Sequence, residues 1–422
     1  EALNTNGTDY LATSAIGKSS DQTFYMDARL NYDRQFDLHH VTGMLMYMQR
    51  EYRSDVLPQR NQGISGRFTY DYGQRYLVEF NFGYNGTERL AKKSRFEFFP
   101  AVSLGWVISN EAFFEPLTDA ISNLKVRGSY GLVGSDETGM GAGAQHFLYI
   151  DQVYLNNIGF TTGVDMNYTL SGPQMITYAV QNASWERVKK LDIGLDIELL
   201  RQITITTDYF KERRYNILLN REAWPESLAY YTAKPWSNKG KVDNWGFEVS
   251  LNWHKEIIKD LFIDFRGNFT YTENKYVDLD EPIYPYVWKT STGKPLSRTT
   301  GYVAEGLFQS QEEIDNSPEQ NLGSVVKPGD IKYRDINGDG KIDSNDEVML
   351  SPYGSTPRIQ YGLGLNITYK KFDFGVFFNG SAKRKIMVSG VTPFGESDYN
   401  VMKFIANERW KPIRIPTPLT RV

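Results

Sequence analysis

The stretch RDINGDGKIDSND, from Arg334 to Asp346, carries oxygen-bearing side chains at the spacing of a calcium-binding loop. An EF-type loop needs oxygen ligands at alternating positions, a glycine at its sharp turn and a carboxylate at its last position. With Asp335 in the first position, Gly340 supplies the turn and Asp346 closes the loop. The predicted ligands are Asp335, Asn337, Asp339, Lys341 (where the main-chain carbonyl is used), Asp343 and Asp346.

The segments on either side of this loop argue against a calcium sensor. They read KPGDIKY and EVMLSPYGSTPR, and neither shows the amphipathic helix that an EF-hand requires. The last ligand is also an aspartate where a glutamate is usual. Two interpretations stay open: a loop that holds a structural Ca²⁺, or an Asp/Asn/Gly turn closed by its own hydrogen bonds. Either would stiffen a loop, and no organic cofactor is predicted.

No other motif indicates chemistry. The chain has no cysteine, and its net charge of −4 gives no basic surface for nucleic acid. The four histidines, which lack metal-ligand spacing, are His39, His40, His146 and His254. Carboxylate pairs occur at Asp27 with Asp33 and at Asp192 with Asp196. Even spacing places each pair on one face of a strand, where a wet polar surface accounts for it without a glycosidase mechanism. G-x-S-x-G, HExxH and P-loop motifs are missing, so we predict that the protein is not an enzyme.

Apolar and polar residues alternate with a period of two through most of the chain. The run TFYMDARLNYDRQF is typical, and GRFTYDYGQRYLVEFNFGYNGT predicts two such strands around a turn at Gly73-Gln74. Similar short turns are expected at Leu200-Arg201 and Lys370-Lys371. Longer connections are expected at 136–177, 216–244 and 278–329. Strands with short turns at one end and long loops at the other are typical of transmembrane barrels.

A soluble β-sandwich or propeller also shows alternation, but composition favours a barrel. The chain is 14% aromatic, yet its mean hydropathy is −0.48. A transmembrane barrel combines a high aromatic content with a polar mean hydropathy, because aromatic rings lie at its membrane interfaces while its lumen is wet. No run of about 18 apolar residues indicates a membrane helix. The start, EALNTNGTDY, shows no export signal, so we interpret the chain as a mature or internal fragment.

Several longer blocks follow one another along the chain: RFEFFPAVSLGWVISNEAFFEPLTDAISNLKVRGSYGLVGSDETG, NASWERVKKLDIGLD, DYFKERRYNILLN, NKGKVDNWGFEVSLNW, GYVAEGLFQSQEEI, KPGDIKYRDINGDGKIDSNDE and GSTPRIQYGLGLNITYKKFDFGVFFNG. Their order and spacing resemble those of SusC/RagA-type TonB-dependent outer-membrane transporters. The resemblance covers most of the chain from about Gly63 onward. In that family the DxNGDGxIDxND stretch belongs to a barrel loop, which favours a stiffening role for 334–346.

The resemblance implies an all-β fold, a transmembrane antiparallel β-barrel of roughly 22 strands. Residues 1–422 would be its C-terminal part with long extracellular loops, and the plug domain and TonB box are not recognisable in this chain. The tail RWKPIRIPTPLTRV contains three prolines, which disfavour a strand. We therefore expect that the first strands and the last one or two strands are also missing.

For the intact protein the resemblance implies active import across the outer membrane of a Gram-negative bacterium. The expected partners are a SusD-like surface lipoprotein as lid, TonB acting through the missing plug and box, lipid, and an oligosaccharide or oligopeptide substrate. A structural subunit of a larger envelope or secretion assembly is the alternative. Aromatic residues in long loops either contact substrate or pack the loops together. The candidates are Trp224, Tyr230, Tyr231, Trp236, Tyr284, Tyr286 and Trp288.

Overall fold

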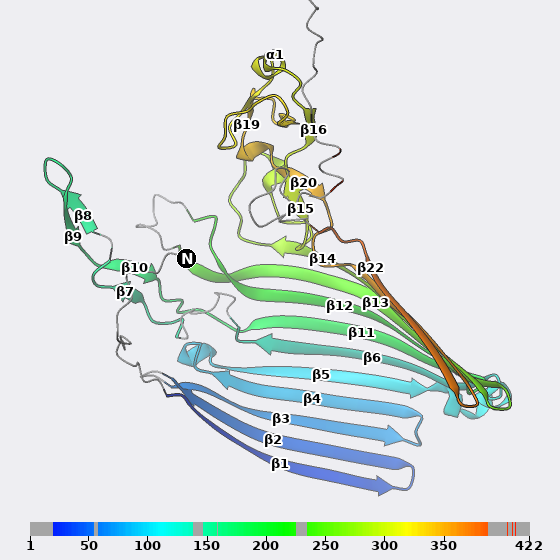
Figure 1. Ribbon diagram of the computed structural model, residues 1–422. Helices are drawn as coiled ribbons and strands as arrows, with labels where there is room; N and C mark the ends of the chain where they lie inside the picture. The colour runs from blue at the N-terminus through cyan, green and yellow to red at the C-terminus, as the bar shows by residue number, and fades with distance from the viewer. Residues whose placement is uncertain are drawn as a thin grey trace, which may run out of the picture.

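A computed structural model describes residues 20–54, 58–137, 147–157, 159–224 and 234–386, together with the single residues 403, 407 and 410. Twelve strands form one sheet in which every neighbouring pair is antiparallel (Figure 1). In sheet order the strands are β1 (Gln22–Phe36), β2 (His39–Arg53), β3 (Gln59–Tyr72), β4 (Tyr76–Thr87), β5 (Phe96–Val107), β6 (Ile121–Ser135), β11 (Glu186–Leu199), β12 (Ile203–Asn220), β13 (Trp236–Ile258), β14 (Leu261–Asp278), β21 (Ile359–Tyr369) and β22 (Phe372–Ala382).

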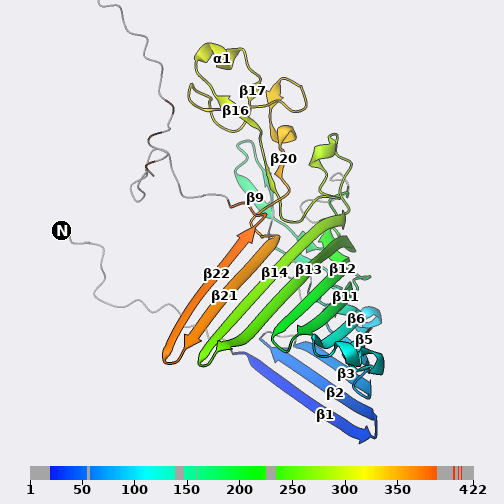
Figure 2. The same cartoon turned by 90° about the vertical axis from the view of Figure 1, so that its right-hand side faces the viewer.

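The sheet has the shape of a section of a barrel wall. Figure 2 shows it bending between the blue strands β1 to β3 and the orange strands β21 and β22. Within the described residues β1 and β22 are its two edges. The predicted all-β architecture of long antiparallel strands is confirmed. None of the described helices has the length and apolarity needed to cross a bilayer.

The connections differ in length between the two ends of the sheet. At one end the predicted turns are confirmed: Gly73 and Gln74 have φ of 57° and 54°, and Leu200 and Arg201 have 52° and 55°. Left-handed pairs of this kind match the twist of a two-residue hairpin. At the other end lie the connections 136–185, 221–235 and 279–358. The prediction of a connection over 216–244 is wrong, because β12 and β13 continue pairing as far as Asn220 and Trp236.

The pairing registers place the alternating residues on two distinct faces. One face, which we call the apolar face, collects Leu30, Leu45, Phe68, Phe80, Val102, Leu104, Ile193, Tyr209, Phe247, Phe269, Leu363 and Phe378. The polar face collects Asp27, Arg29, Arg67, Glu79, Ser103, Arg127, Asp192, Asp208, Glu248, Asn268, Gln360 and Asn379. Large apolar side chains remain exposed on the first face, as Leu30 (68%) and Phe378 (63%) illustrate. A face of this kind requires an apolar environment.

A compact hydrophobic cluster fastens the 136–185 connection to the strand ends. Its buried members are Leu90, Phe99, Leu148, Val180, Ala183, Trp185 and Leu218. The rings of Phe99 and Trp185 meet edge to face at 5.3 Å, and Trp185 Nε1 donates a hydrogen bond to the carbonyl of Arg95. The connection also contains β7 (Gln152–Tyr154), β8 (Gly159–Thr162), β9 (Tyr168–Ser171) and β10 (Gln174–Thr177). This loop is therefore anchored by packing where it leaves the sheet.

The 279–358 connection folds into a lobe that stands beyond the strand ends (Figure 1). Its elements are β15 (Thr299–Gly301), β16 (Ala304–Leu307), α1 (Gln311–Asp315), β17 (Glu319–Gln320), β18 (Ile331–Tyr333), β19 (Lys341–Ile342) and β20 (Val348–Ser351). Three small two-stranded sheets join β15 to β20, β16 to β18 and β17 to β19. The lobe holds both the predicted metal loop and three of the predicted aromatic contacts.

Candidate functional site

The Asp-rich loop, residues 335–346, uses its carboxylates to hold its own main chain. Asp335 Oδ1 accepts a hydrogen bond from the amide of Gly338 at 2.6 Å, and Asp335 Oδ2 accepts one from Gly340 at 2.8 Å. Asp339 accepts from the amide of Lys341 at 2.9 Å. These contacts reproduce the side-chain to backbone pattern of an Asx turn.

Asp346 is the centre of this loop. Its side chain is fully buried and accepts hydrogen bonds from the amides of Ile336, Asn337 and Asp343 at 2.8, 3.3 and 2.9 Å. Such bonds satisfy the oxygen atoms of a carboxylate that has no access to water. Across the described residues, no group of three or more His, Cys, Asp or Glu side chains is arranged to hold a metal ion. Calcium binding by Asp335, Asn337, Asp339, Lys341, Asp343 and Asp346 stays a prediction.

Two of the predicted aromatic residues lie against this loop. Tyr286 and Trp288 stack with ring centroids 4.8 Å apart. Trp288 Nε1 donates to the carbonyl of Asn345 at 2.7 Å, and Asn337 Nδ2 donates to the Tyr286 hydroxyl at 3.1 Å. The structure thus joins two features that lie about 50 residues apart in the sequence. These contacts support the packing interpretation for this aromatic pair.

The other aromatic candidates lie in different surroundings. Trp236 packs against the hydrophobic cluster at the strand ends, and the Trp224 ring lies 5.5 Å from the Arg221 guanidinium. Tyr284 is half-buried, and burial together with the Glu281 carboxylate raises the pKa of its hydroxyl. Tyr230 and Tyr231 lie outside the described residues. Substrate contact by any of the seven stays a prediction.

Asp280 links the bases of two long connections. Its carboxylate accepts hydrogen bonds from Arg221 Nε and Lys239 Nζ, each at 2.7 Å, and its carbonyl accepts one from the amide of Ala223. Burial raises the pKa of the Asp280 carboxyl, but the hydrogen bonds from Arg221 and Lys239 outweigh this and hold the pKa below its ordinary value. The 221–235 and 279–358 connections are therefore joined by charge at the strand ends.

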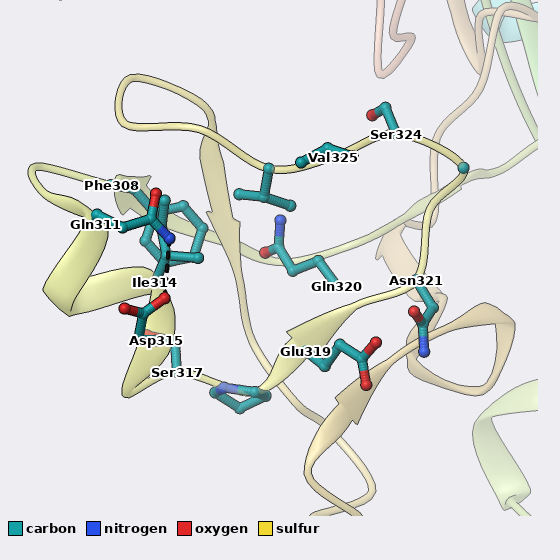
Figure 3. Close-up of a pocket in the computed structure, with 13 residues that line it drawn as sticks. Phe308, Gln311, Ile314, Asp315, Ser317, Glu319, Gln320, Asn321, Ser324 and Val325 are labelled. Atoms are coloured by element: carbon teal, nitrogen blue, oxygen red, sulfur yellow. Dashed lines mark hydrogen bonds between the residues drawn. The ribbon is translucent and has the colours of Figure 1, made fainter.

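The lobe also contains an open cleft of about 680 Å³ (Figure 3). Phe308, which is fully buried, and Ile314 provide apolar surface, and Gln320 lies between α1 and the segment that carries Ser324 and Val325. Other lining residues are polar, including Gln311, Asp315, Glu319 and Asn321. Sequence reasoning missed this cleft, because only the folding of the lobe brings α1 and residues 319–326 together.

An ion-pair network, the Arg127 cluster, lies on the polar face. The guanidinium of Arg127 on β6 contacts Asp208 on β12 at 2.6 Å and Asp192 and Asp196 on β11 at 3.3 and 3.2 Å. Gly194 on β11 is paired in register with Arg127 on one side and with Asp208 on the other. A Cβ on Gly194 would lie 2.5 Å from Arg127 Cζ and 2.5 Å from Asp208 Oδ1. The even-spaced Asp192/Asp196 pair is therefore explained by ion pairing. The two carboxylates of the other predicted pair have different partners: Asp27 contacts Arg29, and Asp33 contacts His40.

Comparison with known proteins identifies the architecture. The family model described as "TonB dependent receptor-like, beta-barrel" matches residues 2–404. TonB-dependent receptor SusC of Bacteroides thetaiotaomicron is 30% identical over 330 residues, which cover 75% of this chain and 30% of that protein. TonB-dependent receptor P3 of Formosa agariphila is 25% identical over 376 residues, covering 85% and 35%. The chain thus spans about a third of the length of these curated relatives.

Solved structures agree in fold. The RagAB peptide importer in its "closed-closed" state superposes with a TM-score of 0.63 at 17% identity, covering 86% of this chain and 41% of that one. Its "open-open" state gives 0.64 at 16% identity, with 86% and 40% covered. At these sequence identities the likeness shows a shared fold and does not indicate a shared ligand.

Proposed function

Because the chain belongs to the TonB-dependent receptor-like β-barrel family of the outer membrane, we propose that it forms part of the wall of an active nutrient importer. The substrate of the intact protein would be an oligosaccharide or oligopeptide. A SusD-like surface lipoprotein would cover the long-loop end, and TonB would act through parts of the protein outside this chain. The relatives are named as receptors and importers, and none of these names gives a catalytic activity.

The continuous apolar face opposite a polar face carries this proposal. In a bilayer, the apolar face meets lipid, because unpaired polar groups are costly there, and backbone hydrogen bonds are satisfied between neighbouring strands. The polar face then lines a wet path, whose charged groups are partly neutralised by pairs such as Arg67 with Glu79 at 2.6 Å. A wall of this kind guides a hydrophilic solute past the lipid without chemical change.

The long loops have two features that suit contact with a lid protein: a stiff lobe and exposed apolar side chains. The lobe is stiffened by the Asp-rich loop and its aromatic pair, and Asp280 joins it to the neighbouring connection. Stiff loops present a constant surface at little cost in conformational entropy on binding. Exposed apolar side chains on the lobe, among them Ile283, Val287 and Val325, suit a protein contact.

Uptake by cells that carry the full-length protein tests the proposal. Cells with and without the gene, each with and without a functional TonB, are given fluorescent oligosaccharides and fluorescent peptides. We expect uptake of one class only when both the protein and TonB are present. Normal uptake of both classes in cells lacking the gene, combined with loss of an envelope complex, would favour the structural-subunit alternative.

A further inference from the structure

On the polar face over β14, β21 and β22, two glycines of the central strand leave room for side chains of the two flanking strands. Gly362 and Gly364 lie on β21 with no side chain to fill the polar face, and each is flanked by one residue from either neighbouring strand. We use the name glycine trough for this set of neighbouring residues: Arg266 and Asn268 of β14, Gly362 and Gly364 of β21, and Phe377 and Asn379 of β22. The registers place Asn268 and Asn379 beside Gly362, and Arg266 and Phe377 beside Gly364.

Phe377 departs from the general pattern of the sheet. It is an aromatic residue on the polar face, and 68% of its surface is exposed. Positions for a Cβ on Gly362 and on Gly364 would each lie 3.3 Å from an atom of its ring, so the ring lies along the β21 backbone. Phe374, on the same strand and 61% exposed, belongs to the apolar face, where lipid accounts for it. Phe377 lies on the opposite, polar face, and covering its exposed ring with a ligand would lower the free energy by removing apolar surface from water.

Hydrogen-bonding groups surround this ring. A Cβ placed on Gly362 would lie 2.9 Å from Asn268 Oδ1 and 3.3 Å from the Phe377 ring. The Asn268 amide and the Phe377 ring are therefore adjacent. Asn268 and Asn379 are both exposed. In the part of the chain that the structure describes, no hydrogen bond or ion pair engages their side chains or that of Arg266. An amide offers two donors and one acceptor, and a guanidinium offers five donors.

We propose that the glycine trough is a saccharide-binding subsite in the path through the wall. The apolar C–H face of a sugar ring would stack on Phe377, and its hydroxyl groups would exchange hydrogen bonds with Asn268, Asn379 and Arg266. Small sites commonly combine an apolar platform with a few placed polar groups in this way. The inference rests on the proposed function and narrows its substrate class to oligosaccharides.

The test measures uptake by cells that carry the full-length protein with a single substitution. Phe377→Leu removes the aromatic face while keeping apolar volume, and Phe377→Tyr keeps the ring. Phe374→Leu is the matched control, because it makes the same change on the same strand but on the lipid side. The probes are fluorescent heptasaccharides of glucan, mannan and a polyuronate, and fluorescent heptapeptides. The amount of folded protein in the outer-membrane fraction normalises each rate.

We expect Phe377→Leu to reduce saccharide uptake by about five- to tenfold, the scale of one lost aromatic contact. Phe377→Tyr and Phe374→Leu should stay within about twofold of the parent. If the parent takes up saccharides and both leucine variants behave alike, the subsite is wrong and the importer proposal stands. If the parent takes up only peptides, the saccharide assignment is wrong. If it takes up no probe, both proposals fall.

Discussion

The Arg127 cluster and the glycine trough lie on the same polar face but use their polar groups differently. In the Arg127 cluster one cation contacts Asp192, Asp196 and Asp208, each 3.3 Å away or less. In the trough, no hydrogen bond or ion pair among the described residues engages the side chains of Asn268, Asn379 and Arg266. Polar groups that satisfy one another hold strands together, whereas polar groups left to water remain available to a solute. The same face of a barrel wall therefore contains both structural and binding surface.

Removing the cation should have the largest effect on stability. Arg127→Leu leaves three neighbouring carboxylates without their counter-charge. We expect the folded barrel to lose about 1 to 2 kcal/mol, at the low end for a buried pair because about a third of the Arg127 side chain is exposed. Arg266→Leu is the matched control and should cost less than about 0.5 kcal/mol. Thermal loss of the folded form in detergent, followed by gel migration, measures both. Equal losses would remove the distinction between the two regions.

A glycine substitution in each region compares their tolerance for an added atom. A Cβ at Gly194 would lie 2.5 Å from two atoms that the ion pairs hold in place. A Cβ at Gly362 would meet the ends of Asn268 and Phe377, which can turn away. We expect Gly194→Ala to destabilise the barrel by about 1 kcal/mol and Gly362→Ala by less than half of that. The same thermal assay applies. A larger loss for Gly362→Ala would mean that the trough is tightly packed and not open.

Adding calcium tests whether the Asp-rich loop resembles the Arg127 cluster, whose polar groups satisfy one another, or the glycine trough, whose polar groups can bind a ligand. Its carboxylates are engaged with backbone amides, as in a satisfied structural cluster, but carboxylates can also coordinate Ca²⁺. If the metal binds, amide hydrogen exchange over 335–346 should slow when Ca²⁺ is added. The double substitution Asp335→Ala and Asp339→Ala should abolish this response while the barrel still assembles. Amides at Leu200 to Gln202 serve as an internal control. No calcium response in the parent protein would eliminate the metal hypothesis.

The smallest expected effect concerns Asp280 and acidic pH. Its pKa is lowered in the folded protein, so the coupling of the two connections is fully present above the ordinary aspartate pKa of about 3.9 and is lost as pH falls through the lowered value. The protection factor of the Ala223 amide, which donates to the Asp280 carbonyl, corrects the exchange rate for its intrinsic pH dependence. We expect this protection factor to be unchanged from pH 7 to 5 and to fall only below about pH 4. Asp280→Asn should give the faster exchange already at pH 7. If this variant retains the slow exchange of the parent, charge does not join the loops.

The sequence by itself determined the strands, the tight turns and the division into two faces. A period of two fixes which residues share a face, and Gly73-Gln74 and Leu200-Arg201 were correctly predicted as turns because neighbouring runs alternate on both sides. The sequence did not determine the strand ends near Asn220 and Trp236, because pairing there continues past the strict alternation through bulges in register.

Only the tertiary structure decided what the chemically capable residues do. It placed Tyr286 and Trp288 on the Asp-rich loop and Trp236 in a hydrophobic cluster, and it turned Asp192 and Asp196 toward Arg127. It also set Phe377 over Gly362 and Gly364. The physical reason is that alternation reports the face of each residue, whereas its neighbours depend on the register between strands and on loop folding, which involve residues far apart in the chain.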